Sequence, residues 1–77
     1  MTSICITRTD DADNAVLDKI IDFVESSGFK LVLSDITVGR QLLYFESSNK
    51  VRGKKLRQME TDLKNLTGDP SISVDFN

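Results

Sequence analysis

The spacing of hydrophobic residues switches between the period of a strand and the period of a helix, and this alternation limits the fold more than any other feature. Residues 3–7 alternate, with Ile4 and Ile6 on one face. Helical spacing follows, and its apolar members are Ala12, Val16, Leu17, Ile20, Ile21, Phe23 and Val24. The sequence therefore predicts a strand and then an amphipathic helix that begins near residue 11 or 12.

Two strands are expected after this helix. Gly28 is suited to the left-handed residue that ends a helix, and residues 29–37 are rich in aliphatic residues at period two. A hairpin tip is expected at Val38-Gly39. The return strand, residues 40–47, is apolar on both phases, which is typical of a central strand covered on both faces.

A second helix and a last strand complete the pattern. Ser47, Ser48 and Asn49 are its candidate caps. The apolar residues of this helix are Leu56, Met59, Leu63 and Leu66. Gly68 and Pro70 are expected to end it, and residues 71–76 alternate again with Ile72, Val74 and Phe76 on one side.

The resulting order of strand, helix, strand, strand, helix, strand predicts an α+β fold of one domain over residues 1–77. We expect a ferredoxin-like βαββαβ plait, in which two helices cover one face of a four-stranded antiparallel sheet and the first and third strands are central. No apolar run approaches the ~20 residues that would span a bilayer. The first residues lack the features of a secretory signal, so a cytoplasmic location is expected.

The amino-acid composition excludes most kinds of catalytic site. The chain has no histidine and a single cysteine, Cys5. A zinc site, a Ser-His-Asp triad, a Cys-His pair and an internal disulfide are therefore excluded. We expect a non-enzymatic protein without a metal or cofactor, in which Cys5 is structural. The aromatic Tyr44 or Phe45 could stack an RNA base, although a covered aromatic in a central strand is the simpler interpretation.

The layout resembles that of the ACT domain, a small plait that regulates amino-acid metabolism. The resemblance spans ITRTDDADNAVLDKIIDFVESSGFKLVLSDIT, GRQLLYFES and LRQMETDLKNLTGDPSISVDF, with residues 28–31 (GFKL) in the place of the family's Gly-x-Asn-Ile. It implies a sensor of an amino acid or small anion at the turn from the first strand into the first helix. The residues implied are Thr9, Asp10, Asp11 and Asn14. The turn has Asp11 but neither the Pro nor the Gly of the family's Asp-x-Pro-Gly, and these residues can also serve only as helix caps.

The segment NKVRGKKLRQ, residues 49–58, concentrates positive charge in a chain whose net charge is -2. Its basic residues are Lys50, Arg52, Lys54, Lys55 and Arg57. On a helical wheel, Lys50, Lys54, Arg57 and Lys64 share a solvent-facing ridge, while Arg52 and Lys55 flank the apolar seam. We therefore expect an acidic protein partner to bind through Lys50, Lys54, Lys55, Arg57 and Lys64.

Three alternatives to this docking surface remain open. The basic segment could be a solvated helix face that pairs with Asp18, Asp22 and Glu25 of the first helix. It could instead bind a nucleic acid, although the net negative charge of the chain opposes this. Finally, the sheet face that carries Cys5 and Thr7 could form a homodimer, because an uncovered apolar face is costly in a monomer.

Overall fold

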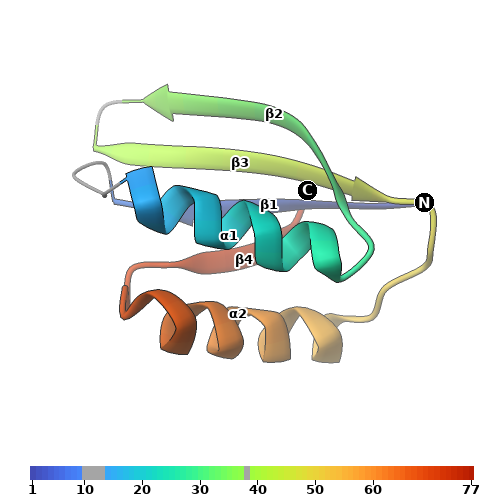
Figure 1. The fold of residues 1–77 in the computed structure, drawn as a ribbon. Coiled ribbons are helices and arrows are strands. Elements are labelled where there is room, and N and C mark those ends of the chain that lie inside the picture. Colours follow the sequence, from blue (N-terminus) through green and yellow to red (C-terminus); the bar gives the residue numbers. More distant parts are fainter. Residues whose placement is uncertain (10–13, 38) are drawn as a thin grey trace.

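Two helices and four strands make up the protein, as seen in a computed structural model that describes residues 1–9, 14–37 and 39–77. In chain order the elements are β1 (Thr2–Arg8), α1 (Asn14–Ser26), β2 (Lys30–Thr37), β3 (Arg40–Ser47), α2 (Gly53–Thr67) and β4 (Ser73–Phe76). The strands form one antiparallel sheet in the order β2-β3-β1-β4 (Figure 1). This confirms the predicted α+β class and the central positions of the first and third strands.

The alternating pattern of β1 divides the sheet into two faces. Ile4 and Ile6 are fully buried, whereas Ser3, Cys5 and Thr7 between them are half-buried. Ile4 and Ile6 lie opposite Phe45 and Leu43 of β3, so both central strands contribute to the same buried layer. The other face of the sheet is not covered by either helix (Figure 1).

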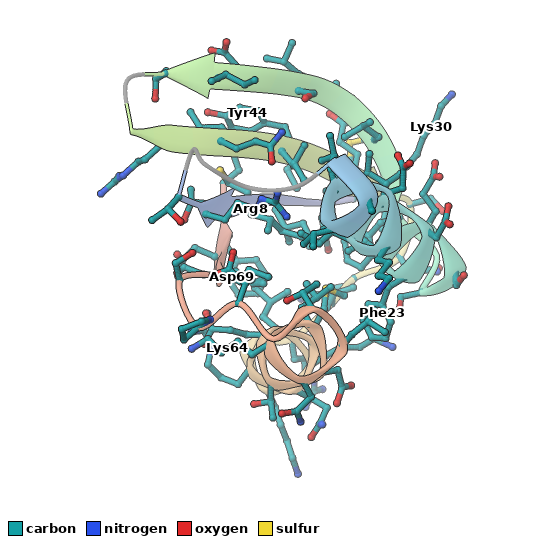
Figure 2. All side chains as sticks on the ribbon, turned by 60° about the vertical axis from the view of Figure 1, so that its left-hand side comes forward. Arg8, Phe23, Lys30, Tyr44, Lys64 and Asp69 are labelled. Carbon is teal, nitrogen blue, oxygen red and sulfur yellow. The ribbon has the colours of Figure 1, made fainter. Side chains whose placement is uncertain are left out.

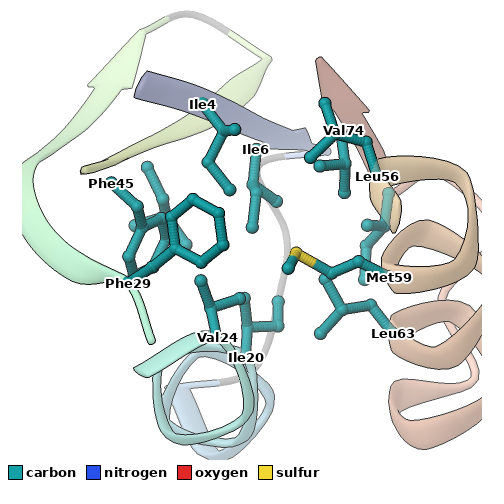
Figure 3. Close-up of a cluster of buried hydrophobic side chains, with 12 residues drawn as sticks. Ile4, Ile6, Ile20, Val24, Phe29, Phe45, Leu56, Met59, Leu63 and Val74 are labelled. Carbon is teal, nitrogen blue, oxygen red and sulfur yellow. The ribbon is translucent and has the colours of Figure 1, made fainter. Parts of the chain in front are cut away.

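Both helices pack their apolar sides on this buried layer (Figure 3). The core consists of Ile4, Ile6, Ile20, Val24, Phe29, Leu43, Phe45, Leu56, Met59, Leu63, Ile72 and Val74. Full burial of such a side chain contributes about 1.5–3 kcal/mol to the free energy of unfolding. The predicted apolar sides of both helices are confirmed at the described residues, which are buried or packed against the core, except for Leu66. Ala12 lies outside the described residues.

Leu66 and Phe76 differ from the expectation that they belong to the core. Leu66 is 46% exposed, because each turn of α2 contributes only a narrow seam to the sheet and Leu66 lies in the last turn. Phe76 is 52% exposed at the end of an edge strand. Its ring lies beside the start of α2, at 3.8 Å from the position that a Cβ on Gly53 would occupy.

The start of α2 also differs from the prediction. The helix begins at Gly53 and its N-cap residue is Arg52, which makes no side-chain capping bond. The expected cap residues instead tie the preceding loop to β1. The hydroxyl of Thr2 donates to the Asn49 carbonyl at 2.8 Å, and the Asn49 amide donates to Ser47 Oγ at 3.2 Å. Local hydrogen bonds to the neighbouring strand therefore take the place of a cap.

The remaining boundaries agree with the sequence pattern within a few residues. Gly68 has a φ of 72° and its amide donates to the Lys64 carbonyl, which ends α2 as predicted. The alternation expected in β2 is interrupted, because its register with β3 shifts between Leu31 and Leu33. The expected start of the first helix and Val38 of the hairpin tip lie outside the described residues.

Candidate functional site

A groove of about 720 Å³ lies between the C-terminal half of α1 and the N-terminal half of α2. Its lining comes from three segments: the end of α1, the loop that connects β3 to α2, and the first turns of α2. The residues that line it are Phe23, Ser27, Ser47, Asn49, Lys50, Val51, Arg52, Lys54, Lys55, Gln58, Met59 and Asp62. This volume is within the range of about 300–1,000 Å³ that is typical of ligand pockets.

The apolar lining of the groove belongs to the margin of the core. Met59 is buried, and Phe23 and Val51 are half-buried and pack against the core cluster. Phe23 lies at the edge of the apolar face of α1. Its neighbour Val24 is buried in the core, whereas Phe23 lines the groove beside α2. The groove thus offers an apolar contact that a partner side chain could cover.

Positive charge surrounds this apolar lining. Lys50, Arg52, Lys54 and Lys55 are all exposed and all line the groove. The N-terminal end of α2 adds the positive end of its dipole to the same region, and its first turn contains no acidic residue. Asp62 is the acidic residue of the lining, and its carboxylate accepts a hydrogen bond of 2.9 Å from Gln58 Nε2.

The lysines of the groove are not paired with the acidic face of α1. In residues 1–9, 14–37 and 39–77, the two ion pairs found both involve Arg57 and neither involves a lysine. The alternative in which Asp18, Asp22 and Glu25 neutralise the basic segment therefore has no ion pair to support it among these residues.

The structure brings together only three of the five predicted partner-binding residues. Lys50, Lys54 and Lys55 line the groove, whereas Arg57 and Lys64 do not. Arg57 turns toward β4, where Nη2 donates to the Val74 carbonyl and lies 3.4 Å from Asp75 Oδ1. Figure 2 shows Lys64 on the side of α2 opposite Phe23. The basic residues that the sequence groups together therefore have different surroundings, and their role in binding a partner stays a prediction.

The predicted ligand turn after β1 is described only at Thr9. Its amide donates to Ser71 Oγ at 3.2 Å, and the two hydroxyl oxygens lie 3.3 Å apart. Asp10, Asp11 and the side chain of Asn14 lie outside the described residues. The turn is therefore linked, through Ser71, to the loop that connects α2 to β4.

Asp69 organises that second loop. Its Oδ1 accepts hydrogen bonds from the amide of Ser71 at 2.8 Å and from the hydroxyl of Ser71 at 2.6 Å. Burial opposes ionisation of Asp69, but these two bonds and the charge of Arg8 outweigh it and lower the pKa of the carboxyl. Asp69 thus remains ionised down to a lower pH than an ordinary aspartate.

Arg8 is the main residue that the sequence pattern did not reveal. It is only 2% exposed, lies on the same face of β1 as Ile6, and is near Asp69 (Figure 2). The alternation of residues 3–7 contained the signal, because one more step of period two places Arg8 on the buried face. A buried arginine is unusual, and its positive charge acts on the Asp69 carboxyl.

The uncovered face of the sheet carries the single cysteine. Cys5 lies opposite Tyr44 of β3 and Asp75 of β4, and all three side chains are on this face. Burial and the nearby Asp75 carboxylate raise the pKa of the Cys5 thiol, although a hydrogen bond with Tyr44 acts in the other direction. A raised pKa makes the thiol a weaker nucleophile at neutral pH, as expected for a structural cysteine.

No metal site, membrane-spanning helix or similar protein was found for the described part of the chain. Among those residues, no group of three or more acidic or cysteine side chains is placed to hold a metal ion. Neither α1 nor α2 is long and apolar enough to cross a membrane. The chain was compared with protein-family models, curated proteins and solved structures, and no match was found in any of the three.

Proposed function

We propose that this protein is a non-enzymatic binding module with a ferredoxin-like βαββαβ plait that docks on a protein partner through the groove between α1 and α2. The order of the elements and the β2-β3-β1-β4 sheet support the plait. The observation that supports docking is the placement of Lys50, Lys54 and Lys55 around an apolar lining.

The chemistry of the groove defines the partner. Lysine side chains without an ion pair among the described residues attract carboxylates, and the N-terminal end of α2 adds to that attraction. Phe23 and Val51, which are half-buried, offer an apolar contact that water does not satisfy. The partner is therefore a protein segment that carries acidic residues beside an exposed aliphatic or aromatic side chain, and this docking is the basis of a regulatory role.

Two other functions have less support from the contacts. A nucleic acid would have to approach a chain of net charge -2 past Asp62 in the same groove. Of the residues implied for an ACT-like sensor, only Thr9 has a described side chain, and its amide already donates to Ser71. A nucleic-acid complex would also weaken steeply with added salt, which distinguishes it from a partner held in part by apolar contact.

A charge-reversal experiment tests the docking proposal. The native protein, a Lys54→Glu/Lys55→Glu variant and a Lys19→Glu/Lys64→Glu variant are used for affinity capture from lysate of the source organism. The two variants carry the same net charge, but only the first alters the groove. We expect an acidic partner protein that the native protein and the Lys19/Lys64 variant retain and the Lys54/Lys55 variant loses.

The captured partner is then mapped on the protein by amide chemical shifts. Perturbation centred on Phe23, Lys55 and Met59 is the expected result. Equal loss of the partner from both variants would show a general effect of charge and would count against the groove. Equal retention by both would leave the basic segment as a solvated helix face.

A further inference from the structure

The two edges of the sheet differ in whether other groups bind their outward-facing backbone amides and carbonyls. At the β4 edge, side chains of α2 occupy the backbone groups that would otherwise be free: the Val74 amide donates to Glu60 Oε1 at 2.9 Å, and the Val74 carbonyl accepts from Arg57. Arg57 and Glu60 also pair with each other at 3.2 Å. Because unpaired edge groups are a template for another strand, this arrangement closes the β4 edge to pairing.

The β2 edge is open. The strand is eight residues long, and all of its residues from Lys30 to Thr37 are exposed except Leu31, which is half-buried. No hydrogen bond joins this strand to any segment other than β3 in the parts of the chain that the structure describes. Among the described residues, β2 is the outermost strand of the sheet on this side (Figure 1).

The exposed side chains of β2 are unusually apolar for a free edge. Val32, Leu33 and Ile36 are 55%, 54% and 63% exposed. Edge strands that avoid pairing are normally short, or carry charges, proline or a β-bulge. β2 is eight residues long and has no proline, although it carries Lys30, Asp35 and the register shift between Leu31 and Leu33. The length of this edge and its three exposed aliphatic side chains make it a template on which another strand could pair.

The charges of β2 are arranged symmetrically about Leu33. On β3, Lys30 lies opposite Glu46, Leu33 opposite Tyr44 and Asp35 opposite Leu42, so Lys30 and Asp35 are equally far from Leu33 along the sheet. Five residues apart, Lys30 and Asp35 would face opposite sides of a regular strand. The register shift between Leu31 and Leu33 brings them to the same face.

We propose that β2 pairs antiparallel with β2 of a second copy of this chain, about a two-fold axis at Leu33. A two-fold axis perpendicular to the sheet keeps each face on its own side, so Lys30 of one copy lies opposite Asp35 of the other, twice per dimer. Leu33 meets its own symmetry mate. The two sheets become one sheet of twice the width.

This pairing is independent of the groove. No residue of β2 lines the groove, so both grooves of the dimer stay accessible. A dimer would therefore present two docking sites to a partner, and failure of either proposal leaves the other unaffected. The pairing also differs from a homodimer through the uncovered sheet face, because it uses the strand edge.

Charge reversal at the two ends of the pairing is the test. Lys30→Asp and Asp35→Lys each place like charges opposite one another in a self-paired dimer, and the double variant K30D/D35K restores opposite charges. Both positions are exposed, but Lys30→Asp also places a second carboxylate opposite Glu46 of the same chain, so circular dichroism is used to check that each variant folds. Sedimentation equilibrium over a concentration series then gives the dimer dissociation constant of each protein.

We expect the native protein and the double variant to dimerise with similar dissociation constants, and each single variant to dimerise at least roughly tenfold more weakly. Mixing the two single variants should restore a one-to-one heterodimer. Amide exchange of β2 should slow as the native protein is concentrated. A native protein that is monomeric at all concentrations, or a dimer that the single variants leave unchanged, would overturn the proposal.

Discussion

A single hydroxyl, that of Ser71, joins the two loops at one end of the sheet. It is within hydrogen-bonding distance of Thr9 and of Asp69, residues that belong to loops far apart in the sequence. The buried charge of Arg8 acts on the same carboxylate. We therefore expect the contact between Thr9 and Ser71 to depend on the ionisation of Asp69.

Replacing Asp69 with Asn tests that dependence. The folded-state pKa of Asp69 lies below its ordinary value, so its ionised form stabilises the fold. This stabilisation is fully present above the unfolded-state pKa, which is about 4. It is lost as the pH falls through the folded-state pKa. We expect Asp69→Asn to cost about 1 kcal/mol or less at neutral pH, since the site is partly exposed. Urea unfolding from pH about 6 down to pH about 2 should show the two proteins converging in acid. A difference that is constant with pH would contradict this role.

The thiol of Cys5 provides a second prediction at the scale of one residue. Burial raises its pKa, so less thiolate is present at a given pH than in a flexible peptide. We expect iodoacetamide to alkylate the folded protein more slowly than the same protein in denaturant at pH about 8, where an ordinary cysteine is partly ionised. Mass spectrometry of timed samples measures the two rates. Equal rates, after correction for the effect of denaturant on a reference thiol, would show that the fold does not protect Cys5.

At the scale of elements, the sequence predicts what depends on local pattern and fails where tertiary contacts decide. The alternation of β1 and the end of α2 at Gly68 follow from side-chain period and backbone preference. The start of α2 does not follow from local pattern. The hydroxyl of Thr2, in a strand far away in the sequence, donates to the loop that contains the expected cap residues. The bond from Arg57 to β4 is also a tertiary contact that the helical pattern does not reveal.

The exposure of β2 likewise cannot be predicted from the sequence. Its aliphatic residues have the composition of a buried strand, and only the arrangement of the two helices leaves Val32, Leu33 and Ile36 uncovered. Pattern can tell which face of a strand is apolar, but the helices that cover a sheet need not extend to its last strand. An apolar edge of this kind is recognised only in the assembled fold.

The glycines at the two ends of α2 should respond oppositely to alanine. Gly68 has a φ of 72°, and no atom lies within 4 Å of the position that a Cβ would take, so Gly68→Ala costs only backbone strain, about 1 kcal/mol. Gly53 has no positive φ, and a Cβ there would make an ordinary contact of 3.8 Å with Phe76. Gly53→Ala should raise the free energy of unfolding by up to about 1 kcal/mol. Thermal unfolding of the two variants checks both signs, and a loss of stability in both would show that the start of α2 is strained.

The closed β4 edge provides a prediction that links α2 to the sheet. Glu60→Ala removes the acceptor of the Val74 amide and the partner of Arg57, and we expect a loss of about 1–3 kcal/mol. Glu60→Gln is the matched control, because its amide oxygen can still accept from Val74 and the loss should be smaller. Denaturant unfolding gives both values. If the two variants lose the same amount, the ion pair rather than the backbone bond is responsible.

At the scale of the whole molecule, one apolar layer connects every element except the outer part of β2. The core cluster includes residues of both helices, of both central strands and of β4 (Figure 3). β1 is paired on both sides, and its inward residues are fully buried. A chain of this length has a free energy of unfolding of roughly 4 to 12 kcal/mol, and a single shared core makes its loss cooperative.

Amide hydrogen exchange should be slow in the central strand β1 and faster in the edge strand β2. We expect the amides of β1 that bond to β3 or β4 to exchange only through global unfolding, so their protection equals the free energy measured with denaturant. The amides of β2 should exchange at least roughly tenfold faster in the monomer, because this strand is paired on one side and largely exposed. The measurement is made by NMR at a concentration where sedimentation shows a monomer, so that self-pairing does not protect the edge. Equal protection of β1 and β2 under those conditions would mean that the edge strand unfolds only with the core, despite its exposure.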